Sequence, residues 1–229
     1  GVRGTTATNF DSCANEHADS NSDAHDPTNG DAVADSWTMR PFVQASNIML
    51  VADGSTSMEG DRSKQLGLAV EVFTSMVAQP NRIGLVTFAG GAALRQPLTN
   101  DRDAVGRALR GTILSAGTRI DLGLQKAREE LNGANHRQEF AKVIVLITDG
   151  EHNGTPEDTV LEQAALAKKE GAIIFTIALG TTQRGQDLLK LVATSPDRHF
   201  FFSPSPTQLV AIYQEIARAI PCPTSTPTP

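Results

Sequence analysis

The sequence has no excess of positive charge and no long hydrophobic run, and each shortage argues against a class of function. Twenty Lys and Arg residues stand against 26 Asp and Glu residues, for a net charge of −6, so no basic surface for nucleic acid is expected. No run reaches the roughly 18 apolar residues of a membrane helix, so any membrane attachment requires an anchor outside this sequence. Residues 1–9 do not resemble a signal peptide, which predicts either a cytosolic protein or a mature form.

Motifs of the common enzyme classes are also missing. The chain contains no G-x-S-x-G elbow, no G-x-x-x-x-G-K-[ST] loop and no G-x-G-x-x-G after a strand. His136, His152 and His199 lack the spacing of a zinc site or a catalytic dyad. We therefore expect a protein that is not an enzyme.

Only two cysteines are present, and they flank the part of the chain that has the composition of a folded domain. Cys13 precedes that part and Cys222 follows it. This placement predicts a disulfide that joins the two ends of one domain, which would indicate an oxidising compartment. Two unrelated free thiols are the alternative.

The composition divides the chain into three parts. Residues 1–45 form an acidic, polar extension that is too poor in large apolar side chains to build a core, with seven acidic and two basic residues in 1–40. Residues 46–220 are predicted to form a single domain. Residues 221–229 are rich in Pro and Thr, as in an extended linker or stalk.

The extension contains one stretch that begins like a calcium-binding loop, DSNSD at 19–23. The pattern then fails, because Ala24 stands where glycine is required and Gly30 where the terminal glutamate is required. We expect a solvated, partly disordered arm there, with His17 and His25 facing solvent.

Four short runs in the middle part are apolar on both faces, as in the buried strands of a parallel sheet: 47–52, 82–89, 142–148 and 172–179. Helical periodicity separates them and also follows the last one. The sequence therefore predicts an α/β fold: a doubly wound, mostly parallel central sheet with helices on both faces.

Sequence signals also predict where several helices begin. A helix is expected from about residue 61, and another over 155–171 with Thr155 as its N-cap. A third, over 205–220, is expected to open with a capping box formed by Ser205 and Gln208.

Oxygen-bearing side chains follow two of the predicted strands and precede one helix. Asp53, Ser55 and Ser57 follow the first strand, Thr118 lies before a helix that starts near Ile120, and Asp149 follows the strand that ends at Thr148. In a doubly wound fold, such loops meet at the carboxyl ends of the strands. Five oxygen groups suit a hard divalent ion such as Mg²⁺ or Mn²⁺.

These three segments together resemble the metal-ion-dependent adhesion site of the von Willebrand factor type A family. The D-x-S-x-S element is Asp53, Ser55 and Ser57, the threonine is Thr118, and the T-D-G element contains Asp149. The resemblance covers about 46–220. It implies that the hydroxyls ligate the ion directly while the carboxylates often act through water. Thr56 departs from the pattern, since relatives frequently have glycine there.

The resemblance implies an extracellular or cell-surface binding module, similar to bacterial surface and pilus-associated proteins. Such a site would bind Mg²⁺, alternatively Mn²⁺ or Ca²⁺, and take an acidic side chain of a protein partner into the open coordination position. Arg119, next to Thr118, could reinforce that preference for acidic groups, but an exposed arginine beside such a site is more often incidental.

Two other functions remain open. The domain could be a subunit of a homo-oligomeric surface filament, using the metal site or the 1–45 arm for subunit contacts. It could also be an intracellular partner of ATPase complexes, to which neither a terminal disulfide nor a Pro/Thr stalk would belong. A bond between Cys13 and Cys222 would tether the last helix and predicts a binder of fixed affinity.

Overall fold

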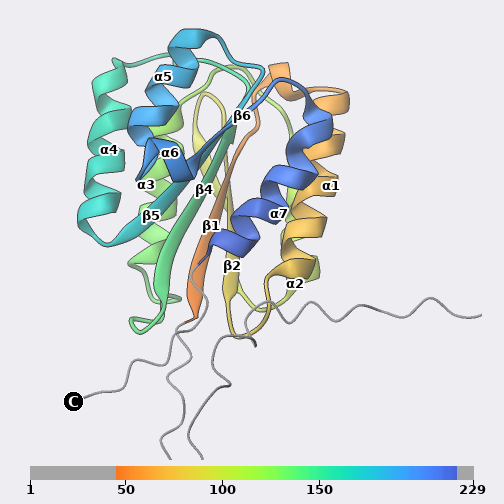
Figure 1. Cartoon of the computed structure of the whole chain (residues 1–229), viewed down its shortest axis with the longest axis vertical. Coiled ribbons are helices and arrows are strands. Elements are labelled where there is room, and N and C mark those ends of the chain that lie inside the picture. The colour runs from red at the N-terminus through yellow and green to blue at the C-terminus, as the bar shows by residue number, and fades with distance from the viewer. Residues whose placement is uncertain (1–44, 221–229) are drawn as a thin grey trace, which may run out of the picture.

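The apolar runs of the sequence form the centre of one six-stranded sheet (Figure 1). The structure, a computed structural model, describes residues 45–220. Across the sheet the strand order is β3-β2-β1-β4-β5-β6, and only β3 is antiparallel to its neighbour. The strands are β1 (Ser46–Asp53), β2 (Arg82–Phe88), β3 (Ala92–Thr99), β4 (Ala141–Thr148), β5 (Ala172–Leu179) and β6 (Phe200–Ser203).

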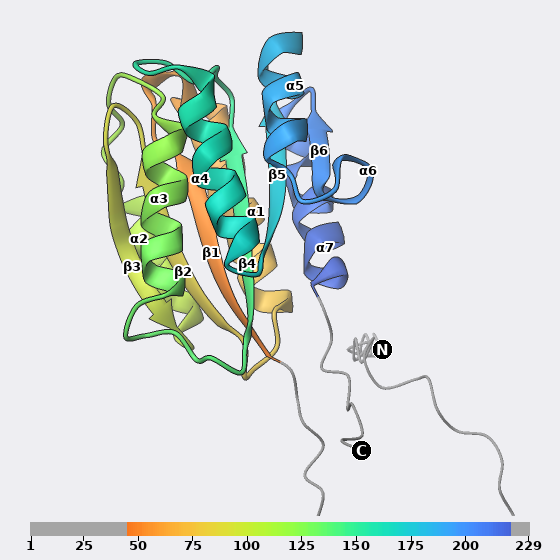
Figure 2. The same cartoon turned by 90° about the vertical axis from the view of Figure 1, so that its left-hand side faces the viewer.

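Helices cover both faces of the sheet, which lies between two helical layers in Figure 2. One layer consists of α1 (Asp61–Met76), α2 (Arg102–Arg110) and α7 (Leu209–Ala219). The other consists of α3 (Ile120–Leu131), α4 (Glu157–Lys169) and α5 (Gln183–Val192), and the short α6 (Pro196–His199) precedes β6. The doubly wound α/β fold predicted from the sequence is confirmed.

The alternation of side chains along β1 divides the apolar core in two. All eight residues of β1 are buried. Ile48 and Leu50 pack toward α1 and α7, where the rings of Phe73 and Tyr213 meet edge to face at 5.5 Å. Met49 points to the opposite face, toward α3 and α4. Burial on both faces explains why the central strands are continuous apolar runs.

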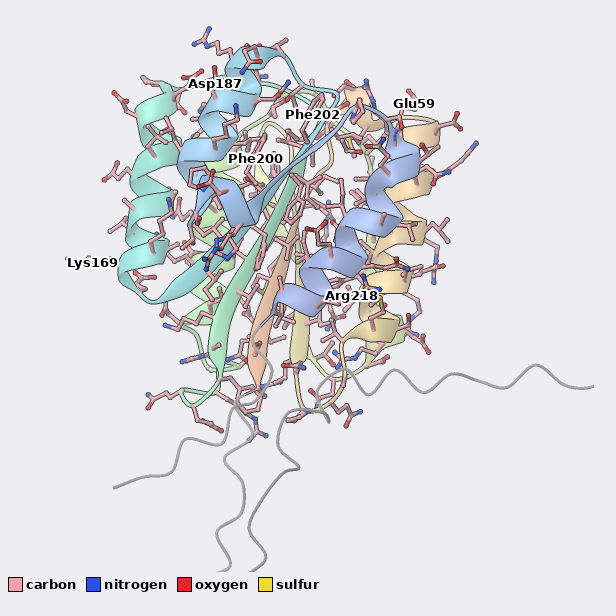
Figure 3. The ribbon with its side chains drawn as sticks, viewed as in Figure 1. Glu59, Lys169, Asp187, Phe200, Phe202 and Arg218 are labelled. Atoms are coloured by element: carbon pink, nitrogen blue, oxygen red, sulfur yellow. The ribbon has the colours of Figure 1, made fainter. Side chains whose placement is uncertain are left out.

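The sheet has a topological switch point between β1 and β4. From β1 the chain moves outward through β2 and β3, then returns so that β4 pairs with the other side of β1. In this arrangement the loops that follow β1 and β4 diverge to opposite sides and leave a crevice between them. We call this end of the sheet the carboxyl end; Glu59, near the start of α1, lies at it in Figure 3.

The opposite end of the sheet, the amino end, is where the described chain begins and finishes. β1 starts there, and α7 runs back to it from the carboxyl end, as the position of Arg218 near the end of α7 shows (Figure 3). The start of β1 and the end of α7 thus lie away from the end of the sheet where β1 finishes at Asp53 (Figure 1).

The structure also corrects two helix starts. The predicted N-cap at Thr155 is wrong: α4 begins at Glu157 after Pro156, and the Thr155 hydroxyl contacts that of Thr159 at 3.0 Å. The predicted capping box at Ser205 and Gln208 does not form either. A single 3₁₀ turn, η2 (Pro206–Gln208), comes first, the Ser205 hydroxyl contacts that of Thr207, and α7 starts at Leu209.

Several predictions concern residues outside 45–220. The acidic extension with its failed calcium loop, the Pro/Thr linker and the pairing of Cys13 with Cys222 all fall there, as do His17 and His25. Within the described residues, every helix is too short or too polar to cross a membrane.

Candidate metal site

The loop after β1 is shaped by its own aspartate. Asp53 is the last residue of the strand, and its Oδ1 accepts a hydrogen bond from the backbone N–H of Ser55 at 2.8 Å. The chain then makes a 3₁₀ turn, η1 (Thr56–Met58), before α1 begins. Ser55 lies directly before this turn and Ser57 within it, so both serines lie just beyond the end of β1, at the carboxyl end of the sheet.

The two serines join this loop to the one after β4. The hydroxyls of Ser55 and Ser57 lie 2.8 Å apart, and the Ser57 hydroxyl donates to Oδ1 of Asp149 at 2.7 Å. Residues 92 positions apart in sequence are thus in direct contact. The contact follows from the pairing of β1 with β4, which places the two loops side by side.

Asp53 is held from β4 as well. The Thr148 hydroxyl donates to its Oδ2 at 2.5 Å. Burial raises the pKa of the Asp53 carboxyl above its usual value, although the hydrogen bonds from Thr148 and Ser55 act in the opposite direction. The fold therefore places this carboxylate where its charge is costly without a positive neighbour.

The loop between α2 and α3 brings Thr118 to the same crevice. Its backbone N–H donates to Oδ1 of Asn153 at 3.0 Å, and its carbonyl accepts from the Asn153 N–H at 3.1 Å. A Cβ on Gly150 would come within 3.4 Å of the Thr118 hydroxyl oxygen, so this hydroxyl lies against the loop that carries Asp149. Ser115, in the same loop, is bridged to Ser55. All three loops therefore meet.

Arg62 is the residue of the site that the sequence analysis did not identify. From the first turn of α1, its Nη1 donates to Oδ2 of Asp149 at 2.6 Å and to the Ser57 carbonyl at 2.9 Å. The Asp149 side chain is fully shielded from solvent, whereas that of Arg62 is 39% exposed. The only available signal was a cation one helical turn after the D-x-S-x-S element.

Arg119, in contrast, is already paired. Its guanidinium donates to both carboxylate oxygens of Asp121, at 2.8 and 2.7 Å. His152 is also engaged, through Nε2 to the Thr155 hydroxyl at 2.8 Å, and burial lowers the pKa of its imidazole. Both side chains lie at the edge of the site with partners of their own.

A groove runs beside the site between α1 and α2. Its volume is about 640 Å³, and it extends from Asp53 past the apolar side chains of Leu66, Leu68 and Leu109. Leu68 is 48% exposed. The carboxyl end thus offers an apolar surface next to the cluster of oxygens.

The donor set fits a hard divalent cation. It offers three hydroxyls and two carboxylates, and among residues 45–220 no group of three His, Cys, Asp or Glu side chains gathers into a different metal site. Moreover, a cationic group, the Arg62 guanidinium, already lies against Asp149. Oxygen ligands of this kind suit Mg²⁺, Mn²⁺ or Ca²⁺.

Known proteins are similar to this chain in sequence. Calcium-activated chloride channel regulator 1 of Equus caballus is 37% identical over 140 residues, which are 58% of this chain and 14% of that protein. Matrilin-1 of Bos taurus is 27% identical over 166 residues, which are 67% of this chain and 29% of that protein. The chain therefore spans less than a third of the length of either relative.

Solved structures of low sequence identity have the same fold. The vWF domain of the type V pili tip protein Mfa5 from Porphyromonas gingivalis superposes with a TM-score of 0.69 at 17% identity, over 78% of this chain and 95% of that one. Proximal thread matrix protein 1 from the mussel byssus, in a structure with a zinc-occupied MIDAS motif, gives a TM-score of 0.67 at 24% identity, over 78% of this chain and 46% of that one.

The family itself follows from the sequence model of the von Willebrand factor type A domain, which matches residues 47–215. This match begins in β1 and ends in α7, so it spans the sheet, both helical layers and all three loops of the candidate site. The chain belongs to the von Willebrand factor type A domain family.

Proposed function

We propose that this domain binds a protein partner through a divalent cation held by Asp53, Ser55, Ser57, Thr118 and Asp149. The observation that carries the proposal is the continuous contact from Ser55 through Ser57 to Asp149, which joins two loops at the switch point of the sheet. Mg²⁺ is the ion we propose, with Mn²⁺ or Ca²⁺ as alternatives.

The chemistry of these residues favours an acidic partner. A bound divalent cation would supply a positive charge with an open coordination position. Ser55, Ser57 and Thr118 are neutral hydroxyls and leave that charge in place, while Asp53 and Asp149 neutralise it only in part. A carboxylate of the partner would complete the neutralisation, and the groove beside Asp53 offers apolar surface for the residues around it.

No group in this arrangement is proposed to carry out a reaction. Domains of this type generally serve interaction, and the described residues around the candidate ion are engaged in holding its loops. We therefore propose a binding role without enzymatic activity, at the cell surface or outside the cell.

A structural role in a surface filament is the second candidate. Two structural neighbours, the Mfa5 pilus tip protein and the SpaC pilus adhesin of Lactobacillus rhamnosus GG, come from pili. In this alternative, an acidic side chain of a neighbouring copy, for example from the acidic 1–45 extension, would be the group that reaches the cation.

The proposed pairing of Cys13 with Cys222 bears on how the site is regulated. The described chain starts and ends at the same end of the sheet, which is compatible with a covalent link between the segments that continue from there. Such a link would tether α7 and favour a fixed binding affinity. Mass spectrometry of the unreduced protein tests the pairing.

Sedimentation of the unreduced protein, with Mg²⁺ and with chelator, tests the function. Isothermal titration should show Mg²⁺ binding by the natural protein, and Asp149→Ala should abolish it because the carboxylate that links the loops is gone. Asp158→Ala, which removes an exposed carboxylate on α4, is the control and should bind normally.

The sedimentation result separates the two candidates. Metal-dependent self-association that Asp149→Ala removes would favour the filament subunit. A monomer in every condition would favour capture of a different, acidic protein. Equal Mg²⁺ binding by the natural protein and Asp149→Ala would refute the proposed site.

A further inference from the structure

The ion pair between Arg62 and Asp149 lies inside the candidate metal site. Arg62 reaches across from α1 to the loop after β4, and the same Nη1 also holds the Ser57 carbonyl. Asp149 consequently has one oxygen bonded to the Ser57 hydroxyl and the other bonded to a guanidinium. Both of its oxygens are thus engaged by groups of the chain itself.

A positive charge at this position and a divalent cation oppose each other. A guanidinium and a divalent ion beside the same carboxylate repel each other, and the single negative charge of the carboxylate cannot neutralise both. Arg62 is also the more adaptable partner, because its side chain is partly exposed while that of Asp149 is shielded. The arginine can therefore move out toward solvent, whereas the aspartate stays.

We infer that Arg62 is an internal competitor of the divalent cation: it neutralises Asp149 when no ion is bound and must be displaced when an ion arrives. This inference rests on the proposed metal site. It assigns to Arg62 the role of setting the ion affinity, without a direct role in holding the ion.

Two consequences follow for the protein without metal. First, the buried Asp149 carboxylate is never left without a cation, which would otherwise be costly. Second, part of the ion's binding energy is used to displace Arg62, so the site binds its ion more weakly than the same oxygens would alone. Occupancy would then change with the surrounding ion concentration.

Mn²⁺ titration of the full chain, followed by electron paramagnetic resonance at constant ionic strength, tests the inference. We compare the natural protein with Arg62→Gln, which removes the charge. The expected result is about tenfold tighter Mn²⁺ binding, because the ion no longer has to break the attraction between Arg62 and Asp149, which has this size for two unit charges about 3 Å apart in a water-like dielectric. Arg62→Lys keeps the charge and should stay close to the natural protein.

The chain offers a matched control. Arg110 makes an ion pair with Glu71 at the same distance of 2.6 Å, also with α1, but both partners are exposed. Arg110→Gln should leave Mn²⁺ affinity unchanged. Thermal unfolding adds a second readout: with chelator, Arg62→Gln should melt below the natural protein, and the rise in Tm on adding Mn²⁺ should be larger.

Each result decides the matter. Unchanged or weaker Mn²⁺ binding by Arg62→Gln overturns the inference while leaving the metal site intact. Tenfold tighter binding by Arg62→Lys would overturn the explanation by charge. If neither the natural protein nor Arg62→Gln binds Mn²⁺, the proposed metal site fails and the inference fails with it. Binding by Arg62→Gln alone would support both.

Discussion

The two ends of the sheet both bury polar side chains, but buried carboxylates flank the central strands β1 and β4 only at the carboxyl end. At the amino end, the Asn47 amide donates to the Arg137 carbonyl at 3.0 Å and contacts Nδ1 of His136 at 3.1 Å. At the carboxyl end, carboxylates take the corresponding places: Asp53 is the last residue of β1, and Asp149 directly follows β4.

The difference separates the end that holds the start of β1 from the end that holds the candidate site. A neutral amide can be buried at modest cost once it is hydrogen-bonded, whereas a carboxylate costs more to bury and needs hydrogen bonds or a positive partner. At the amino end, neutral groups contact the Asn47 amide, and the buried Glu130 carboxylate of α3 accepts hydrogen bonds from the Leu98 N–H and the Asn135 amide. The carboxyl end holds the negative charges of Asp53 and Asp149. Within the described residues, Arg62 forms an ion pair with Asp149.

Replacing the buried amide at the amino end by a carboxylate should lower the free energy of unfolding more than any other change considered. Asn47→Asp would place a carboxylate beside the Arg137 carbonyl, while its register neighbour Lys142 is already bonded to Asn132 and to the Glu170 carbonyl. We expect a loss of about 3–5 kcal/mol in the free energy of unfolding at pH 8. The loss should shrink near pH 5.5, because a protonated His136 could then pair with the new carboxylate. Urea unfolding at both pH values measures it.

Asp53→Asn makes the reverse replacement at the carboxyl end, of a carboxylate by an amide. Burial already raises the pKa of Asp53, which means that the folded state disfavours its charge. Removing that charge should therefore cost far less stability than Asn47→Asp does, while metal binding is lost. Equal losses from the two variants would show that the ends do not differ in the way described.

The support of Asp53 by Thr148 can be tested with a matched pair of threonines. Thr148 and Thr176 are both fully buried in central strands, but the Thr148 hydroxyl donates to Asp53 while that of Thr176 donates to the Leu189 carbonyl at 3.0 Å. Thr148→Val should weaken Mg²⁺ binding by about 10–100-fold, as is usual when a group that orients a ligand is removed. Isothermal titration measures it.

Thr176→Val should destabilise the fold without affecting the ion. If the two variants weaken Mg²⁺ binding equally, the effect is a general loosening of the sheet, and Thr148 has no special role in positioning Asp53.

Protonation of the histidines should change the free energy of unfolding less than the substitutions above. Burial lowers the pKa of His136 at the amino end and of His152 at the carboxyl end. The unfolded chain therefore binds more protons than the folded one as the pH falls below about 6.5, so the free energy of unfolding decreases, by at most about 1.4 kcal/mol per pH unit for each histidine.

Burial is the main cause at both histidines, and the charges around them differ. Lys142 adds to the lowering of the pKa at His136, whereas the nearby Asp121 carboxylate opposes it at His152. His136→Gln and His152→Gln should each flatten the decrease in stability between pH 7 and 5, as measured by urea unfolding in chelator. An unchanged slope in either variant would contradict the contribution assigned to that histidine.

The sequence predicted the centre of the fold better than its edges. The four central strands are buried on both faces, so their apolar runs are unmistakable. The edge strand β3 contains Arg95, Gln96 and Pro97 and is mostly half-buried or exposed, and β6 has four residues, so neither produces such a run. The helices α2 and α5 were missed as well.

The candidate site could be predicted to the level of its loops. Asp53, Ser55, Ser57, Thr118 and Asp149 belong to segments that follow or precede recognisable elements, and strand order brings those segments together. The partner of each charge could not be predicted in this way, because it depends on side-chain direction. Arg119 is adjacent in sequence yet pairs with Asp121, while Arg62, from another element, reaches Asp149.

β1 connects the two ends directly. It begins at Ser46, where the described chain enters the sheet, and ends at Asp53 in the candidate site, with hydrogen-bonded neighbours along both sides. If a captured partner were pulled while the chain was anchored through its preceding segment, the tension would run along this one strand. In that case the hydrogen bonds of β1 to β2 and β4 would be loaded in shear, all together, and this central strand would carry the force between the anchor and the captured partner.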